Sequence, residues 1–202
     1  MSIVPKAAAA GARGALAPIA RTLHGLGVSA NAVTAAGLVI TCAGATLVAV
    51  GQPGIALLVL LFGALADAID GQVARLSGGG TKLGAFLDST FDRLSDAALC
   101  VAALIVGGTH GDALLFVSGI VALVSGSLVP YIRAKAESLG LTASVGLAPR
   151  EARLALIILG VAAWAVTGSL SLFAAAIAVV AFLSTITAAQ RVAHVARALR
   201  DT

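Results

Sequence analysis

Long apolar segments separated by short polar turns constrain the fold of this chain more than any other feature. A run without charged residues covers residues 33–50, which is about the length that a helix needs to cross the hydrocarbon core of a bilayer. Five further apolar segments follow and end near residues 75, 106, 131, 166 and 189. With 59% hydrophobic and 11% charged residues among its 202 positions, the chain is too apolar for an ordinary soluble domain. The sequence therefore predicts an all-α, polytopic membrane protein with six transmembrane helices.

The N-terminal segment has a different character from the apolar runs. Residues 5–23 carry Lys6, Arg13 and Arg21 among Ala, Leu and Ile, a mildly amphipathic basic pattern that is typical of a helix lying in the membrane interface. The segment lacks the continuous apolar centre of a signal peptide, and we expect it to be retained. We therefore predict one membrane domain over residues 1–202, with an interfacial helix at 5–23 and the six-helix bundle at 33–197.

The basic residues predict the orientation of the chain. All thirteen Lys and Arg residues flank the apolar segments on one side, whereas the connections at 51–54, 107–112 and 167–169 contain none. The positive-inside rule places the basic side, with both termini, in the cytoplasm, and we expect the cell membrane as the location. Because the basic residues form no stripe on a soluble face, membrane lipids and an anionic substrate are expected partners, and nucleic acid is not.

Four carboxylates stand at the ends of two apolar segments that face this basic side. Asp67 and Asp70 are three residues apart, and Asp88 and Asp92 are four apart, so each pair shares one helix face. A single intramembrane Asp can be satisfied by a polar neighbour or can specify packing, but four together repel one another unless cations neutralise them. Oxygen ligands without His or Cys favour Mg²⁺, with Mn²⁺ also possible. The sequence thus predicts a metal site that opens to the cytoplasm.

The turn between the two acidic pairs is rich in glycine. Residues 78–80 are all Gly and lie close to Arg75, Thr81 and Lys82, a setting in which backbone N–H groups and a metal ion can hold phosphate oxygens. Small residues at Gly71 and Ala74 leave room for a bulky group beside Asp70, although close helix packing is an alternative explanation. The pattern indicates phosphoryl or phosphatidyl transfer.

The spacing of these residues resembles a family signature. The sequence has every fixed position of the CDP-alcohol phosphotransferase motif. These positions are Asp67, Asp70, Gly71, Ala74 and Arg75, then, after eight residues, Gly84, Asp88 and Asp92. The resemblance implies a six-helix membrane enzyme, commonly a homodimer, in which an alcohol displaces CMP from a CDP-linked lipid held by two metal ions. It implies that Asp67, Asp70, Asp88 and Asp92 are metal ligands and that Asp92 is also the catalytic base. It further implies CDP-lipid contacts from Asn31, Thr34, Gly71, Ala74, Arg75, Thr81 and Gly84.

A second group of basic residues bears on the acceptor. Segments around 131–137, 149–154 and 190–191 resemble those of actinobacterial phosphatidylinositol phosphate synthases, which implies CDP-diacylglycerol as donor and inositol 1-phosphate as acceptor. By that resemblance the acceptor phosphate contacts Lys135, Arg153 and Arg191 first, and Arg133 and Arg150 second; Asp96 supports the metal site. For any one of these basic residues, a solvated positive-inside flank is an alternative.

Two other functions remain open at this point. A phosphatidylglycerol phosphate synthase would keep the aspartates and accept glycerol 3-phosphate in the same basic pocket. A non-enzymatic ion carrier would use the aspartates as an ion path, but the acids cluster at one membrane face and no charged series continues to the other. The carrier is therefore disfavoured.

Overall fold

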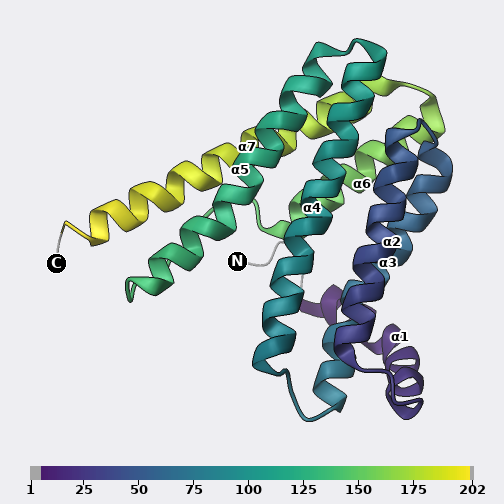
Figure 1. Ribbon diagram of the computed structural model, residues 1–202, viewed down its shortest axis with the longest axis vertical. Helices are drawn as coiled ribbons and strands as arrows, with labels where there is room; N and C mark the ends of the chain where they lie inside the picture. Colours follow the sequence, from purple (N-terminus) through teal and green to yellow (C-terminus); the bar gives the residue numbers. More distant parts are fainter. Residues whose placement is uncertain (1–5, 201–202) are drawn as a thin grey trace.

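A computed structural model describes residues 6–200, and this part of the chain folds entirely into helices and their connections (Figure 1). Polar caps begin several of the helices: Ser29, Thr81 and Asp112 each accept a hydrogen bond from a backbone N–H three residues ahead. Position 5 of the expected interfacial helix lies outside the described residues. The helices are α1 (Lys6–Gly25), α2 (Ala30–Ala49), α3 (Pro53–Leu76), α4 (Lys82–His110), α5 (Ala113–Ser138), α6 (Arg150–Thr167) and α7 (Leu170–Ala198).

Four of these helices, α2, α3, α5 and α7, are long and apolar enough to cross a membrane. The other two members of the expected bundle are interrupted by charge. Helix α4 has 29 residues, but its first half contains the acids from Asp88 to Asp96. Helix α6 has 18 residues and begins with Arg150, Glu151 and, one turn later, Arg153. The all-helical prediction is confirmed, and the crossing of the membrane by α4 and α6 remains a prediction.

The helices pack as neighbours around two shared cores. Helix α2 lies against α3 and α4, α4 against α5, α5 against α7, and α6 against both α7 and α3. Close approach between α2 and α3 depends on glycine, because a Cβ at Gly63 would lie 2.5 Å from the Thr41 hydroxyl. Helix α1 packs on α3 through a small separate core around Ala20 and Val73. The helix that carries Asp67 and Asp70 is therefore held from three sides.

The connections without Lys or Arg lie together at one end of the bundle, the upper end in Figure 1. They include Gly51, Gly111 and Gly168, which all have positive φ and so reverse the chain at helix ends. The turn between α3 and α4 lies at the opposite, lower end, and α5 and α7 diverge from the bundle toward the left of Figure 1. This distribution agrees with the charge pattern on which the predicted orientation depends.

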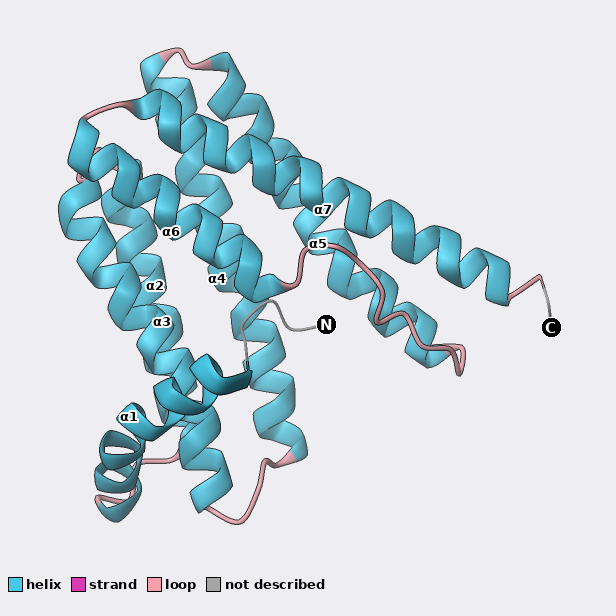
Figure 2. Ribbon diagram, turned by 180° about the vertical axis from the view of Figure 1, so that it is seen from behind, coloured by secondary structure: helices cyan, strands magenta, loops and turns pink. Residues whose placement is uncertain are grey.

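The connection between α5 and α6 is long and extended. Residues 139–149 return from the tip of α5 along α5 and α7 toward the centre of the molecule, where α6 begins (Figure 2). Arg191 of α7 holds this connection through a 2.9 Å hydrogen bond from its Nε to the carbonyl oxygen of Val145. As a result the first residues of α6, Arg150 and Arg153, enter the bundle beside the acidic helices instead of lying on its outer rim.

Candidate functional site

The turn between α3 and α4 brings the two acidic pairs onto adjoining helices. Gly78 and Gly79 have φ values of 89° and 111°, a backbone region that residues with a Cβ seldom adopt. Thr81 then caps α4 by accepting a 2.9 Å hydrogen bond from the Gly84 N–H. The glycines reverse the chain between the two helices as predicted, and α4 then packs on α2 and α5.

A cavity of about 360 Å³ opens beside Asp70 and Asp88. Six of the seven residues predicted to contact the CDP-lipid line it, and Arg75 is exposed one residue beyond this lining. Its walls come from the start of α2, the end of α3, the glycine turn and the start of α4. The lining residues are Ser29, Ala30, Asn31, Thr34, Asp70, Gly71, Ala74, Ser77, Gly79, Gly80, Thr81, Gly84, Ala85 and Asp88.

Two glycines that line the cavity, Gly84 and Gly71, have different roles. A Cβ at Gly84 would lie 3.0 Å from Oδ1 of Asn31 and 3.2 Å from Oγ1 of Thr81, so glycine there lets α4 start close to α2. A Cβ at Gly71 would meet only the Nη1 of Arg75, at 3.7 Å. Close helix packing therefore does not explain Gly71, and its open side faces the cavity.

Asp70 meets the requirement for a cation-binding group. Its side chain is buried, and within residues 6–200 its Oδ2 has no hydrogen-bond partner. A buried carboxylate oxygen without a partner is costly, and a divalent cation in the neighbouring cavity would satisfy it. Asp88 shares this cavity and is exposed, so the pair offers oxygen ligands of the type that Mg²⁺ and Mn²⁺ prefer. We call Asp70 and Asp88 the cavity half of the carboxylate site.

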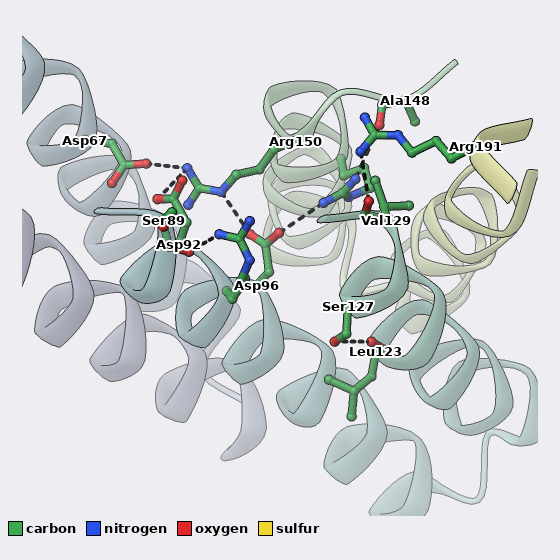
Figure 3. A network of polar contacts seen from close by, with 12 residues as sticks. Asp67, Ser89, Asp92, Asp96, Leu123, Ser127, Val129, Ala148, Arg150 and Arg191 are labelled. Carbon is green, nitrogen blue, oxygen red and sulfur yellow. Dashed lines mark hydrogen bonds and ion pairs between the residues drawn. The ribbon is translucent and has the colours of Figure 1, made fainter. Parts of the chain in front are cut away.

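The other two predicted ligands, Asp67 and Asp92, contact an arginine. Nη1 of Arg150 lies 2.8 Å from Oδ2 of Asp67 and 2.9 Å from Oδ1 of Asp92 (Figure 3). Among the described residues, no three His, Cys, Asp or Glu side chains form a ready-made metal cluster. We call Asp67 and Asp92, together with Arg150, the arginine half of the site.

Asp96 connects the arginine half to the rest of α6. Its Oδ1 lies 3.3 Å from Nε of Arg150, and its Oδ2 lies 3.2 Å from Nη2 of Arg153. Arg153 is buried and also donates to the carbonyl oxygen of Ala148. The structure thus places Asp96 as a partner of two arginines one turn beyond Asp92. Arg93, next to Asp92, points its guanidinium to the carbonyl oxygen of Ser89.

The five basic residues predicted to bind the acceptor phosphate divide into two groups. Arg150 and Arg153 join the aspartates. Arg191 donates to the carbonyl oxygens of Val145 and Val129, at 2.9 and 2.8 Å. Arg133 forms an exposed ion pair of 2.8 Å with Glu137 on its own helix, and Lys135 is exposed nearby. The sequence does not predict the contacts of Arg150 with Asp67 and Asp92. Arg150 lies 83 positions from Asp67 along the chain, and no local pattern indicates that the two meet.

Comparisons with known proteins agree with this geometry. The family model for CDP-alcohol phosphatidyltransferase matches residues 27–189. Archaetidylinositol phosphate synthase of Methanothermobacter thermautotrophicus is 38% identical over 135 residues, which cover 67% of each chain. Phosphatidylinositol phosphate synthase of Mycolicibacterium smegmatis is 38% identical over 146 residues, 71% of this chain and 65% of the relative. The alignments therefore extend over about two thirds of the length of these relatives.

Solved structures of a third relative have the same fold. The crystal structure of Mycobacterium tuberculosis phosphatidylinositol phosphate synthase in complex with manganese and citrate superposes with a TM-score of 0.82 at 33% identity, covering 88% of this chain and 87% of the other. The structure of that enzyme with CDP-DAG bound gives a TM-score of 0.81 at 33% identity, with coverage of 89% and 92%.

Proposed function

The chain belongs to the CDP-alcohol phosphatidyltransferase family, and on that premise we propose that it transfers the phosphatidyl group of CDP-diacylglycerol to inositol 1-phosphate. The observation that carries the proposal is the cavity that Asp70 and Asp88 line together with six of the predicted CDP-lipid contacts. One buried oxygen of Asp70 has no hydrogen-bond partner within residues 6–200. Relatives named phosphatidylinositol phosphate synthase, and one solved with CDP-DAG bound, support the choice of donor and acceptor.

The four aspartates are proposed to hold divalent metal, Mg²⁺ or Mn²⁺, as two ions. Asp70 and Asp88 line the cavity, and Asp67 and Asp92 stand on the same two helices one turn nearer the bundle centre. When bound, such ions neutralise the diphosphate and make CMP a better leaving group. The manganese in the Mycobacterium tuberculosis enzyme supports this assignment.

The residues around the cavity bind and orient the donor. Asn31, Thr34 and Thr81 offer polar groups from two helix starts, while Gly71 and Ala74 leave space for the CDP group against α3. Arg75 and Gly84 complete the proposed contacts. The aliphatic chains of the lipid remain among the apolar helices, so the reacting phosphorus is held at the polar edge of the bundle.

Asp92 is proposed to accept the proton of the acceptor hydroxyl. The hydroxyl oxygen attacks the phosphorus of the phosphatidyl group, a new phosphorus–oxygen bond forms, the bond to CMP breaks, and CMP leaves with the electron pair. Lys135, Arg153 and Arg191 are proposed to bind the phosphate of the acceptor, because charge-assisted contacts suit a phosphate dianion. Arg133 and Arg150 are the second choices for this contact.

The proposed setting is the plasma membrane, with six helices crossing it, α1 in the interface and the site open to the cytoplasm. A homodimer is the proposed assembly. The absence of Lys and Arg from the three connections at one end of the bundle supports this orientation.

The assay that tests the function measures CMP release by the purified protein with CDP-diacylglycerol and one acceptor at a time. We expect inositol 1-phosphate to react and free inositol to react poorly, since it cannot neutralise the basic pocket. Preference for glycerol 3-phosphate would replace the inositol assignment with phosphatidylglycerol phosphate synthesis. Reaction of neither phosphate, with a neutral alcohol used instead, would refute the phosphate pocket.

A further inference from the structure

One nitrogen atom of Arg150 lies between two carboxylates that belong to different helices. Nη1 contacts Asp67 of α3 at 2.8 Å and Asp92 of α4 at 2.9 Å. The side chains are only partly exposed, at 25% for Arg150, 32% for Asp67 and 22% for Asp92. In such a setting two carboxylates need a nearby cation. The guanidinium supplies it at oxygens that belong to two of the proposed metal ligands.

The charge balance of this arrangement is incomplete. Asp67 and Asp92 carry two negative charges, and Arg150 provides one positive charge that it also shares with Asp96. A divalent ion would neutralise the pair fully, and it binds carboxylate oxygens at shorter distance than a guanidinium does. The guanidinium and the metal ion therefore compete for the same carboxylate oxygens, and the metal ion binds them more strongly.

A second contact keeps Arg150 nearby if it leaves Asp67 and Asp92. Its Nε lies 3.3 Å from Oδ1 of Asp96, and Asp96 is itself fixed by Arg153 at 3.2 Å. Figure 3 shows this chain of contacts running from Asp67 to Asp96 and on toward the residues near Arg191. A guanidinium released from the metal ligands thus remains tethered to Asp96 of α4, beside Arg153.

We propose that Arg150 is an exchangeable counter-ion: it occupies the oxygens of Asp67 and Asp92 before metal binds, and metal displaces it toward Asp96. This rests on the proposed function in one respect, that the aspartates bind divalent metal. Displacement leaves the guanidinium with unfilled donors on the side where the basic residues for the acceptor phosphate stand. Metal loading then prepares the acceptor site, and Arg150 acts as a positioning residue that couples the two.

The test measures Mn²⁺ affinity, by electron paramagnetic resonance or calorimetry, on the purified full-length protein without CDP-lipid or acceptor. Arg150→Gln removes the competitor and should bind Mn²⁺ at least about tenfold more tightly than wild type, as expected for loss of a charge-assisted contact. Arg93→Gln is the matched control, because it removes the same charge beside Asp92 from a residue that contacts the Ser89 carbonyl instead. Its affinity should change much less.

Thermal unfolding supplies a second readout. Arg150→Gln should unfold at a lower temperature than wild type in EDTA, since Asp67 and Asp92 lose their cation. The difference should become smaller in saturating Mn²⁺, where only the contact with Asp96 is missing. If the variant fails to fold without metal, it can be purified in Mn²⁺ and titrated with a chelator to obtain the same affinity.

Three outcomes would overturn the exchange. Unchanged or weaker Mn²⁺ binding by Arg150→Gln would mean that the arginine and the ion use different oxygens. An equal gain in Arg93→Gln would reduce the effect to long-range charge. A destabilisation of the same size in Mn²⁺ as in EDTA would make Arg150 a permanent structural partner of Asp67 and Asp92. Failure of the proposed function would look different: CMP release with inositol 1-phosphate would be absent while Mn²⁺ still exchanged with Arg150.

Discussion

The two halves of the carboxylate site are built from the same two helices but face different surroundings. Asp70 and Asp88 line a cavity of about 360 Å³, and one buried oxygen of Asp70 has no partner within the described chain. Asp67 and Asp92, one turn away, are bridged by Arg150. The difference comes from what lies opposite each pair: a glycine turn and the start of α2 in one case, the start of α6 in the other.

This contrast shows how one signature can provide two kinds of site. The cavity half is open and short of positive charge, which favours a ligand that brings its own cation. The arginine half is partly neutralised by Arg150, so the protein can fold around its acids before any ion binds. A reaction that needs both halves must therefore fill one and rearrange the other.

Removal of divalent metal should have the largest effect on turnover, because both halves of the carboxylate site are proposed to need it. Without divalent ions neither half can hold the diphosphate, so CMP release from CDP-diacylglycerol and inositol 1-phosphate should fall to background in EDTA. Excess Mg²⁺ or Mn²⁺ should restore it, and Ca²⁺ serves to test for a general charge effect. Full turnover in EDTA would show that the acids have another role.

Asp92→Asn should separate binding from chemistry within the arginine half. The substitution removes the proposed base, so kcat should drop by about 10²- to 10⁴-fold. Binding of CDP-diacylglycerol, measured directly, should decrease far less because Asp70 and Asp88 still face the cavity. Asp96→Asn is the comparison, since Asp96 contacts two arginines and is not a proposed base. Turnover by Asp92→Asn at the wild-type rate would exclude the role.

The cavity half could be predicted from the sequence, and the arginine half could not. Spacings of three and four place each acidic pair on one helix face, and the adjacent glycines specify the turn that joins them. These are local rules, and the structure agrees with both. The contact of Arg150 with Asp67 depends instead on the path of residues 139–149, which carries the start of α6 into the bundle. No periodicity encodes that path.

The helix ends show the same limit. The apolar runs end near residues 106, 131 and 189, but α4, α5 and α7 continue to His110, Ser138 and Ala198, the last of these close to the expected end of the bundle at residue 197. Hydropathy measures where a segment becomes polar, whereas a helix continues until its backbone is capped or reversed. Gly111 ends α4 with a φ of 66°. An apolar run therefore underestimates the length of a helix that has a charged end.

Substitutions of the proposed acceptor contacts should have an effect of intermediate size. They test the basic residues that lie beyond the arginine half of the site. Lys135→Ala should raise the apparent KM for inositol 1-phosphate by roughly tenfold to a hundredfold, as expected for one lost charge-assisted contact, and should barely alter that for CDP-diacylglycerol. Arg153→Ala and Arg191→Ala should do the same, with added loss of stability because they also contact backbone carbonyls. Arg197→Ala, on an exposed part of α7, is the control. Equal effects on both substrates would argue against a dedicated phosphate pocket.

The smallest effect is expected at Gly71, where folding and binding should respond in opposite directions. Alanine favours a helix over glycine by about 0.5–1 kcal/mol, and a Cβ at this position would meet only the Arg75 guanidinium at 3.7 Å. Gly71→Ala should therefore unfold at the same or a slightly higher temperature than wild type. The added methyl group projects into the cavity of the CDP-lipid contacts, so the apparent KM for CDP-diacylglycerol should rise several-fold while that for inositol 1-phosphate stays constant.

Gly14→Ala is the matched control for this substitution. Gly14 lies within helix α1, and a Cβ there has nothing within 4 Å, so alanine should give the same gain in helix propensity without touching the cavity. Its KM for CDP-diacylglycerol should equal that of wild type. If both variants bind the donor normally, Gly71 does not face the bound lipid, and it does not belong to the CDP-lipid contacts of the cavity. If Gly71→Ala instead unfolds at a clearly lower temperature, helix packing explains this glycine after all.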